Sequence, residues 1–284
     1  MIRQKSFEND MPTLYLVATP IGNMDEMTPR AVEILKQVDV IACEDTRTSG
    51  QLLKHFDIHA RLISYQNFNE DPSARGIIHL LSQGQNVALI SDAGYPLISD
   101  PGQRVVMEAS SRGYNVVPIS GSSAVLNAVV ASGLTAQPFI FVGFLPSSAN
   151  DCRKKLIEYR SYPMTLVFYE APHRIARMLE CVQEVLGDRR CVIAREMTKI
   201  HEEFLRGTVS ELRKEAEGLK GEIVVVVEGN RDDYEKDVDY GEILHMVNEY
   251  IEQGISRSDA VKEIARKTGI SKNKIYEIVH EKIS

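Results

Sequence analysis

The 284-residue sequence contains no apolar run long enough to span a lipid bilayer. Its first twelve residues carry acidic side chains and no apolar centre, so we expect no secretory signal and interpret residues 1–12 as a flexible N-terminal tail. Cysteine is also scarce, and the four residues form neither a C-x-x-C pair nor a cluster with histidine: Cys43, Cys152, Cys181 and Cys191. This pattern argues against structural zinc or any other metal site and predicts buried thiols in a cytoplasmic protein.

The sequence also lacks an excess of positive charge and the common nucleotide-binding motifs. Its net charge of −7 argues against a protein that coats nucleic acid unselectively, although a local basic face could still bind a polyanion. After the first predicted strand the chain reads ATPIGNMDEMTPR (residues 18–30), with neither G-x-G-x-x-G nor Gly-Lys-Ser/Thr. A dinucleotide-binding fingerprint and a P-loop are therefore not expected.

Two blocks of alternating strands and helices account for most of the chain, which is long enough for two domains. Short, continuous apolar strands that alternate with helices predict an α/β fold with a mostly parallel sheet covered on both faces. A turn-rich segment, SGLTAQP (residues 132–138), separates the blocks, so we predict α/β domains at residues 13–136 and 137–230. The predicted strands are LYLVAT, DVIAC, RLISY, NVALIS and NVVPIS in the first block, and FIFVGFL, TLVFYE, CVIARE and EIVVVVEG in the second.

The C-terminal part has a different character. Residues 231–240 are acidic and poor in apolar side chains, which predicts a linker, and residues 241–284 have helical periodicity without a strand. Ala265, Gly269 and Ile275 have the spacing of a helix-turn-helix, with six basic and two acidic residues between positions 257 and 274. This small helical extension is either a nucleic-acid-contacting module or a helical hairpin with a solvated charged face.

Polar loops follow several strands of the first block, at the sheet edge where α/β proteins bind ligands. The stretch ISDAGYPLISDPG (residues 90–102) holds two Ser-Asp units with glycine and proline, which predicts a rigid acidic loop. ISGSSAVLNAVVASG (residues 119–133) offers free N–H groups and hydroxyls at a helix start, with a serine N-cap as the simpler interpretation. CEDTRTSG (residues 43–50) is dense in charge, and capping by Asp45 or Thr46 would leave Glu44 and Arg47 unexplained. Together these loops favour a shared ligand site.

A further polar cluster follows a strand of the second block, in FYEAPHRIARM (residues 168–178). There Glu170, His173 and Arg174 precede a predicted helix. The histidine is a general base, a hydrogen-bond donor to a phosphate, or only a residue at the helix start. The segment from Cys191 to Val209 carries charged residues for which a salt-bridged surface is an equally good interpretation: Arg195, Glu196, Lys199 and Glu203.

Six motifs, in order, carry a resemblance to a known family: LVATPIGNMDEMTPRA, CEDTRTS, LISDAGYPLISDPG, PISGSSAVLNAVVASGL, FVGFLP and FYEAPHR. Together they closely resemble the branch of the tetrapyrrole methylase superfamily that acts on ribosomal RNA, over roughly residues 14–229. The resemblance implies an S-adenosylmethionine-dependent enzyme that methylates the ribose 2′-hydroxyl of a cytidine in the decoding centre of 16S rRNA. It also implies two α/β domains of the tetrapyrrole methylase type with the cofactor in the cleft between them, a homodimer, and the small ribosomal subunit as partner.

The resemblance also implies the residues of the cofactor site. They are Pro20, Gly22, Ser91, Asp92, Ala93, Gly94, Ser123, Ala124, Glu170, Gly207 and Thr208. Because a ribose hydroxyl is a very weak acid, a positioned base should help the transfer. The catalytic candidates are Glu44, Asp45, Arg47, Glu170 and His173, and Asp92 is as suited to binding the cofactor as to moving a proton.

Arginine and lysine side chains that could contact phosphates occur in both blocks. The candidates for RNA binding are Arg47, Arg153, Lys154, Lys155, Arg174 and Arg177. The alternatives to an RNA methyltransferase are a methylase of the same superfamily that acts on a corrinoid or porphyrin precursor, and a DNA-binding regulator that uses the helical extension. A dinucleotide-binding oxidoreductase fits the fold class but lacks the glycine fingerprint.

Overall fold

The computed structural model describes residues 3–65, 70–230, 240–268 and 272–280. It divides into an N-terminal unit, Met1–Gly229, and a C-terminal unit, Asn230–Ser284, which we describe separately. Within the described ranges, no helix has both the length and the apolar character that crossing a membrane requires. The predicted linker falls almost entirely on residues 231–239, outside the described residues.

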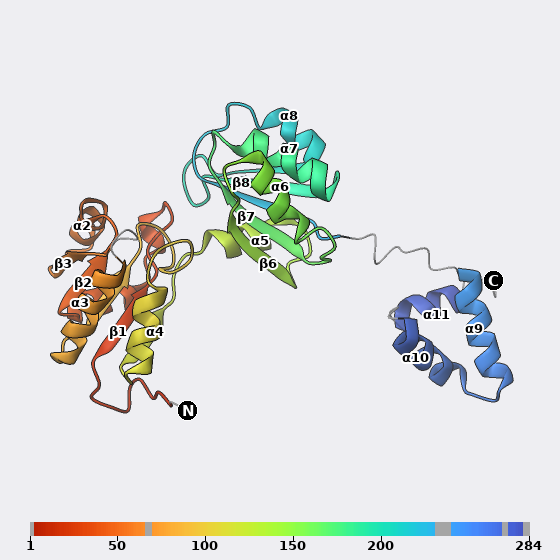
Figure 1. Ribbon diagram of the computed structural model, residues 1–284, viewed down its shortest axis with the longest axis horizontal. Helices are drawn as coiled ribbons and strands as arrows, with labels where there is room; N and C mark the ends of the chain where they lie inside the picture. Colours follow the sequence, from red (N-terminus) through yellow and green to blue (C-terminus); the bar gives the residue numbers. More distant parts are fainter. Residues whose placement is uncertain (1–2, 66–69, 231–239, 269–271, 281–284) are drawn as a thin grey trace. The chain divides into compact units, whose positions relative to one another are not determined.

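Five parallel strands form the first sheet of the N-terminal unit, in the order β3-β2-β4-β1-β5 (Figure 1). The strands are β1 (Thr13–Val17), β2 (Val40–Cys43), β3 (Arg61–Ser64), β4 (Val87–Ile90) and β5 (Asn115–Ile119). The helices that follow them are α1 (Pro29–Gln37), α2 (Thr46–His55), α3 (Glu70–Ser82), α4 (Gln103–Ser111) and α5 (Ala124–Ser132), with a short 3-10 turn, η1 (Met24–Glu26), before α1. The predicted parallel sheet is confirmed.

Both faces of this sheet are buried, as its continuous apolar strands require. Neighbouring residues of β2 show this directly, because successive side chains of a strand point to opposite faces. Ile41 packs with Leu35 of α1 in one core, whereas Val40 packs with Ile77 of α3 in the other. Helices α1 and α2 therefore cover one face, and α3 and α4 cover the opposite face.

The strand order reverses at the neighbouring strands β1 and β4. The chain leaves β1 through α1 towards β2, but it leaves β4 through α4 towards β5, on the other side of β1. Because α1 and α4 cover opposite faces of the sheet, the two loops separate at its carboxyl edge. Such a switch point is where α/β sheets bind their ligands.

The second sheet is mixed and has the order β6-β7-β10-β8-β9. Its strands are β6 (Phe139–Phe144), β7 (Thr165–Glu170), β8 (Arg190–Arg195), β9 (Glu203–Thr208) and β10 (Ile223–Val227), and its helices are α6 (Ala149–Ile157), α7 (Ile175–Leu186) and α8 (Val209–Glu215). Only β6 and β7 are parallel neighbours; the other pairs are antiparallel. Strand β9 is absent from our sequence prediction, because an edge strand with partly exposed side chains lacks the apolar run by which the others were identified.

Helix α5 follows β5 of the first sheet in the chain but packs on the second sheet. Val125, Ala128 and Val129 of α5 lie in one core with Val192 of β8 and Val224 of β10. Helices α6, α7 and α8 contribute to the core on the other face of the second sheet. The sequence placed α5 in the first domain, but its buried face packs on the second sheet; the boundary at residues 136–137 stays a prediction.

The described part of the C-terminal unit consists of three helices with their own core. Its helices are α9 (Tyr240–Glu252), α10 (Arg257–Thr268) and α11 (Lys272–His280). Val247, Ile264 and Ile275, one from each helix, are completely buried against one another. Of the predicted helix-turn-helix positions, Ala265 and Ile275 pack in this core, while Gly269 lies outside the described residues.

Candidate active site

The loops after β1 and β4 are joined to each other at the switch point. Thr19 N–H donates to the Gly94 carbonyl at 2.9 Å, and Gly94 N–H donates to the Thr19 carbonyl at 3.0 Å. The Thr19 hydroxyl donates to the Ser91 carbonyl at 3.0 Å, and the Ser91 hydroxyl donates to the Gly94 carbonyl at 2.9 Å. Gly94 has a φ of +78°, a left-handed conformation that glycine adopts without steric cost. The first Ser-Asp unit is thus a tightly bonded turn.

The loop after β5 packs closely on the loop after β1. A Cβ atom on Gly121 would lie 2.9 Å from Cβ of Ala18, so only glycine fits there without a shift. Gly121 N–H donates to the Tyr95 hydroxyl at 3.1 Å, which links the same loop to the one after β4. The Ser123 hydroxyl caps α5 by accepting from Leu126 N–H at 3.4 Å, as the simpler interpretation predicts.

A cavity of about 420 Å³ lies between these loops and the second sheet, and we call it the cleft. The loops after β1, β4 and β5, with the first residue of α5, supply Ile21, Ala93, Gly94, Tyr95, Ile98, Ser99, Asp100, Ser123 and Ala124. The second sheet and its loops supply Phe144, Tyr169, Glu170, Ala171, Pro172, Met197, Gly221, Glu222, Ile223 and Val224. A lining of mostly apolar groups with a few polar ones, at this volume, is typical of small-molecule sites.

A second hollow of about 250 Å³ adjoins the cleft and shares Ile21, Ala93 and Glu222 with it. Its lining is more polar and includes Pro20, Gly22, Thr48, Ser91, Asp92 and Lys199. The Lys199 ammonium pairs with Glu196 at 3.0 Å and with Glu222 at 3.1 Å.

Ion pairs explain the charged segment between Cys191 and Val209. Arg195 pairs with Glu203, and Lys199 pairs with Glu196, so the salt-bridged interpretation is confirmed for all four residues. Lys199 is nevertheless more than a surface charge, because it also lines the polar hollow.

Four carboxylates gather around the loops after β2 and β4. Burial raises the pKa of Asp100 to about 6, and the neighbouring carboxylates of Glu44 and Asp92 contribute in the same direction. Burial likewise raises the pKa of Asp92, to which the Asp45 backbone N–H donates a hydrogen bond. These groups interact because the carboxyl ends of the neighbouring strands β2 and β4 meet at one edge.

Glu170 at the end of β7 is the most buried carboxylate of the cleft, with 3% of its surface exposed. Its Oε1 atom accepts from Ala171 N–H at 2.8 Å and pairs with Arg174 Nε at 3.1 Å. Its Oε2 atom is buried without a hydrogen-bond partner among the described residues. Burial raises the pKa of Glu170, although Arg174 opposes the shift. An unpaired buried acceptor in a cavity wall is suited to a ligand that donates a hydrogen bond.

Most of the predicted cofactor residues come together in the structure. Ala93, Gly94, Ser123, Ala124 and Glu170 line the cleft. Pro20, Gly22, Ser91 and Asp92 line the adjoining polar hollow.

Gly207 and Thr208 line neither cavity. They end β9, where Gly207 pairs with Cys191 at the start of β8, while the cleft lies near the other end of these strands. Thr208 instead forms the capping box of α8 with Glu211. The geometry therefore does not support their predicted contact with a cofactor.

The predicted catalytic residues divide into two groups. Glu44 and Asp45 lie close enough to Asp100 and Asp92 to affect their pKa values, and Glu170 lines the cleft. Asp45 is also the N-cap of α2, as one interpretation predicts.

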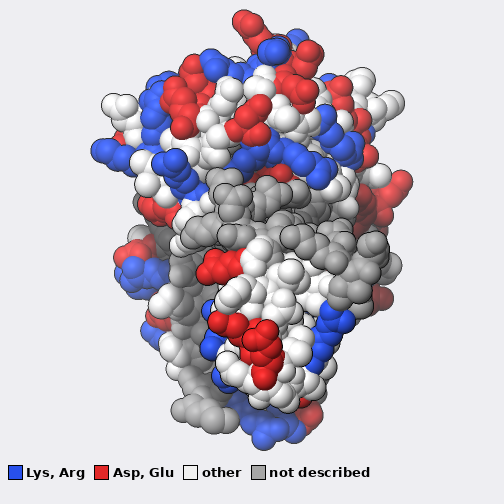
Figure 2. Space-filling model, turned by 90° about the vertical axis from the view of Figure 1, so that its right-hand side faces the viewer, with Lys and Arg blue, Asp and Glu red and all other residues white. Residues whose placement is uncertain are grey.

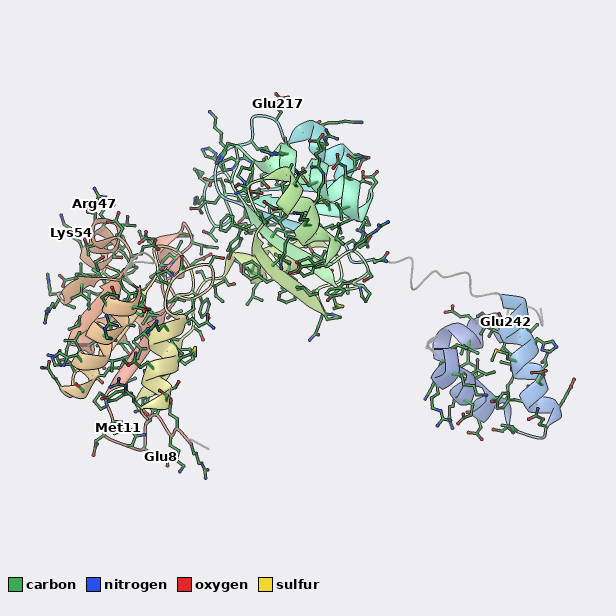
Figure 3. The ribbon with its side chains drawn as sticks, viewed as in Figure 1. Glu8, Met11, Arg47, Lys54, Glu217 and Glu242 are labelled. Carbon is green, nitrogen blue, oxygen red and sulfur yellow. The ribbon has the colours of Figure 1, made fainter. Side chains whose placement is uncertain are left out.

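Arg47 and His173 line neither the cleft nor the polar hollow. Arg47 lies in α2, the helix that also carries Lys54 (Figure 3), and it pairs with Asp45 at 3.4 Å with 90% of its side chain exposed. His173 is exposed in the turn between β7 and α7.

The predicted RNA-binding residues occupy different environments. Arg153, Lys154 and Lys155 of α6 pair with Glu184, Asp151 and Glu158, and remain partly or largely exposed. Such exposed pairs are weak and leave the cations accessible to phosphate.

Arg174 is less accessible, because it bonds the Leu145 carbonyl at 2.6 Å as well as Glu170, whereas Arg177 is exposed. Acidic and basic side chains are interspersed on the face that Figure 2 shows.

Several residues of the cleft are absent from the sequence prediction. They are Tyr95, Asp100, Phe144, Tyr169, Met197 and Glu222. The signal for Asp100 was present, since it belongs to the second Ser-Asp unit of a stretch already identified as a rigid loop. Tyr169 directly precedes Glu170 and Phe144 lies in the motif FVGFLP, whereas nothing local marks Met197 as a residue of a site.

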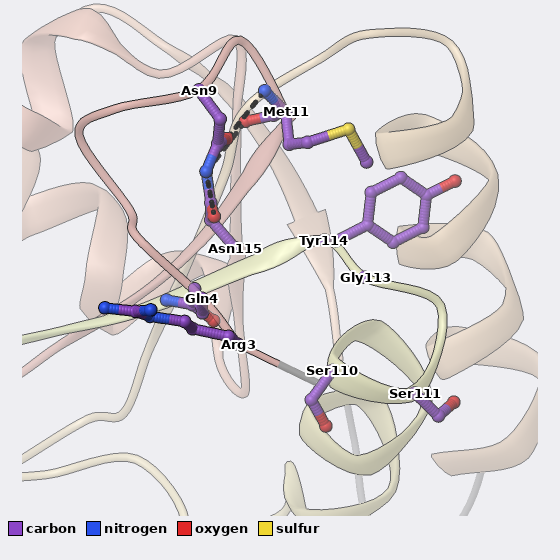
Figure 4. Close-up of a pocket in the computed structure, with 9 residues that line it drawn as sticks. All are labelled: Arg3, Gln4, Asn9, Met11, Ser110, Ser111, Gly113, Tyr114 and Asn115. Atoms are coloured by element: carbon purple, nitrogen blue, oxygen red, sulfur yellow. Dashed lines mark hydrogen bonds between the residues drawn. The ribbon is translucent and has the colours of Figure 1, made fainter. Parts of the chain in front are cut away.

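Another hollow, of about 460 Å³, lies between the N-terminal segment and the turn from α4 to β5 (Figure 4). Arg3, Asn9 and Tyr114 are among its lining residues, and Asn9 bonds the side chain of Asn115, the first residue of β5. The hollow is therefore at the amino edge of the first sheet, opposite the cleft. The described residues that line it include no carboxylate, imidazole or thiol.

Comparisons with known proteins agree with this architecture. The family model described as Tetrapyrrole (Corrin/Porphyrin) Methylases matches residues 13–213. Among solved structures, a uroporphyrin-III-C-methyltransferase from Thermus thermophilus is similar, with a TM-score of 0.54 and 19% identity over 76% of this chain and 94% of that one. A diphthine synthase matches with a TM-score of 0.59 and 13% identity over 76% and 89%. These two likenesses concern the fold alone.

The two sheets and the cleft between them thus define the class: a two-domain α/β methylase of the tetrapyrrole methylase type. Relatives of higher sequence identity show which family within this class the chain belongs to. A ribosomal RNA small subunit methyltransferase I from Halalkalibacterium halodurans is 43% identical over 99% of this chain and 100% of that protein. Its namesake from Bacillus subtilis is 42% identical over 99% of each chain. The chain belongs to the ribosomal RNA small subunit methyltransferase I family.

Proposed function

We propose that the protein transfers a methyl group from S-adenosylmethionine to the ribose 2′-hydroxyl of a cytidine in the decoding centre of 16S rRNA. The observation that carries the proposal is a cleft at a topological switch point in a chain that is 43% identical, over almost its whole length, to a ribosomal RNA small subunit methyltransferase I. The substrate is then the small ribosomal subunit in the cytoplasm, and the resemblance to the family favours a homodimer.

The residues of the cleft fit the cofactor. Oε2 of Glu170 is a buried acceptor without a partner among the described residues, which suits a hydroxyl or amino group. The turn at Gly94 lets the backbone approach a ligand closely, and the first turn of α5 after Ser123 has N–H groups suited to a carboxylate. We therefore assign cofactor binding to Ala93, Gly94, Ser123, Ala124 and Glu170, with Pro20, Gly22, Ser91 and Asp92 at the polar end.

When bound, the cofactor supplies a methyl group already activated on a sulfonium. The chain itself must then align the attacking oxygen with that carbon, exclude water and accept a proton. Buried side chains such as Ile21, Met197 and Ile223 form the dry part of the wall.

RNA binding is assigned to exposed cations on several elements. Arg47, Arg177 and the run from Arg153 to Lys155 would hold phosphates, which position an RNA without specifying its sequence. The target nucleotide has to be unpaired or flipped out to reach a cleft of this size. Arg174 is better assigned to orienting Glu170, because both of its interactions are internal.

The decisive experiment is methyl transfer from labelled S-adenosylmethionine to small ribosomal subunits from a strain that lacks this protein. Uroporphyrinogen III serves as the alternative acceptor, because the fold is shared with a methylase of that class. The proposal predicts label on one cytidine ribose of 16S rRNA, located by mass spectrometry of nuclease fragments, and none on the tetrapyrrole. Label on uroporphyrinogen III alone, or on a base instead of a ribose, would contradict it.

A further inference from the structure

The cleft has a closed part and an open part. Ile21, Gly94 and Glu170 are buried and line the closed part. Ile98 and Phe144 also line the cleft, but they are 46% and 56% exposed, so they mark its mouth. A cofactor of small size fits the closed part, whereas a nucleotide that belongs to a ribosomal subunit enters through the mouth.

Asp100 is carried by the loop that forms one side of this mouth. Leu97 and Ser99 of that loop have φ values of +71° and +72°, a left-handed conformation that residues with side chains rarely adopt. Packing maintains it, because Leu97 contacts the core that contains Leu89, while Ile98 and Ser99 remain exposed. Backbone strain kept in place by packing is characteristic of functional loops, and here it positions Asp100, which follows directly.

The groups around Asp100 favour a proton acceptor. Ser91 and Asp92 lie near its carboxylate in the loop after β4, Glu44 faces it from the loop after β2, and Tyr169 faces it from β7. None of these neighbours is a cation, and burial together with the nearby carboxylates brings the pKa of Asp100 to about 6. A base with a pKa near the working pH is well matched to proton transfer.

The other two carboxylates of the cleft are less suited to this role. Glu170 pairs with Arg174 at 3.1 Å, and Glu222 pairs with Lys199 at 3.1 Å, so each of these carboxylates already has a cationic partner. Asp92 lines the polar hollow and not the cleft. Asp100 is thus the one carboxylate that lines the cleft without a cationic partner among the described residues.

We propose that Asp100 is the general base of the methyl transfer, accepting the proton of the ribose 2′-hydroxyl at the mouth of the cleft. The inference rests on the function proposed above. The O–H bond breaks and its proton passes to the Asp100 carboxylate, while an oxygen lone pair forms the bond to the methyl carbon. The carbon–sulfur bond breaks and its electron pair remains on sulfur, giving a neutral thioether. Asp100 then releases the proton to water, and no oxidant or reductant is required.

The test compares Asp100→Asn with wild type and with Asp25→Asn, a control in the exposed turn after β1 that lines neither cavity. Single-turnover rates on small subunits are measured from acid to alkaline pH, and binding of S-adenosylhomocysteine is measured by calorimetry. Asp100→Asn should lower the rate constant by roughly 10²–10⁴-fold, leave cofactor affinity unchanged and remove the rise in rate that wild type shows near pH 6. Asp100→Glu should recover part of the rate, and Asp25→Asn should behave as wild type.

Each other outcome has a definite meaning. A wild-type rate and pH profile in Asp100→Asn would overturn the inference while leaving the proposed function intact. Loss of S-adenosylhomocysteine binding in Asp100→Asn would identify Asp100 as a cofactor ligand and equally overturn it. Inactivity of wild type on small subunits would instead overturn the proposed function, and the inference with it.

Discussion

Replacing Gly121 by alanine tests the closeness of the loops that form the floor of the cleft. The added Cβ would lie 2.9 Å from Cβ of Ala18 and 3.2 Å from its carbonyl oxygen, and Ala18 is almost completely buried at the end of β1. Because the Ala18 carbonyl belongs to the backbone and the Ala18 Cβ is attached rigidly to it, neither atom can turn aside, and the loop after β5 has to move. Overpacking of this kind costs about 1–3 kcal/mol of unfolding free energy.

The matched control is Gly76→Ala. Gly76 lies within α3, is exposed to solvent, and would place its new Cβ in open space. Alanine is the better helix former by about 1 kcal/mol, so this variant should be slightly more stable than wild type.

Thermal unfolding of the three proteins gives the answer. For a chain of this size, 1 kcal/mol corresponds to roughly 2–4 °C in Tm, so Gly121→Ala should unfold about 2–12 °C below wild type and Gly76→Ala slightly above it. Calorimetry should also show weaker S-adenosylhomocysteine binding by Gly121→Ala alone, since its Ser122–Ala124 segment is displaced. If both variants unfold together at or above the wild-type temperature, the close packing of these loops is refuted.

Three further predictions concern charge and the two units. Since the pKa of Asp100 is raised from 3.8 to about 6, folding becomes less favourable as pH rises through that interval. At about 1.4 kcal/mol per pKa unit the full shift would correspond to about 3 kcal/mol, and solvent screening of this partly exposed carboxylate makes the effect smaller. Asp100→Asn should therefore be more stable than wild type at pH 8 but not at pH 3 in urea unfolding. In the same assay, Arg174→Ala should lower the free energy of unfolding by roughly 3 kcal/mol, because it leaves Glu170 buried without its cation. Arg47→Ala removes a side chain that is 90% exposed, so it should keep the stability of wild type and raise only the KM for small subunits. Ile275→Ala shortens a completely buried side chain in the core of the C-terminal unit, so it should lower the stability of that unit by about 2–5 kcal/mol. The calorimetric transition of the N-terminal unit, which has separate cores, should not shift, and a shift in both transitions would contradict this prediction.

The sequence was sufficient to predict the first sheet because its strands are continuous apolar runs separated by glycine, proline and caps. It also predicted that the loops after β1, β4 and β5 share one edge, since parallel strands place their carboxyl ends together. That topology brings Gly94 and Ser123 into one cleft although nearly thirty positions separate them in the chain.

Other features depend on tertiary contacts that local patterns do not encode. Strand β9 exists because β8 offers it an edge, and α5 belongs with the second sheet only through its packing. The two Ser-Asp units look alike in sequence, yet Asp92 and Asp100 line different cavities because the backbone turns at Leu97 and Ser99. Likewise, the sequence predicted Arg174 as an RNA contact from its charge, but it could not show that Arg174 pairs with the buried Glu170.

A crystal structure with S-adenosylhomocysteine tests the central claim most directly. The account predicts that the ligand lies between the loops after β1, β4 and β5 and the second sheet, with Oε2 of Glu170 accepting a hydrogen bond from it. Ligand density at the amino edge of the first sheet, or a cleft left empty by a saturating ligand, would contradict the account.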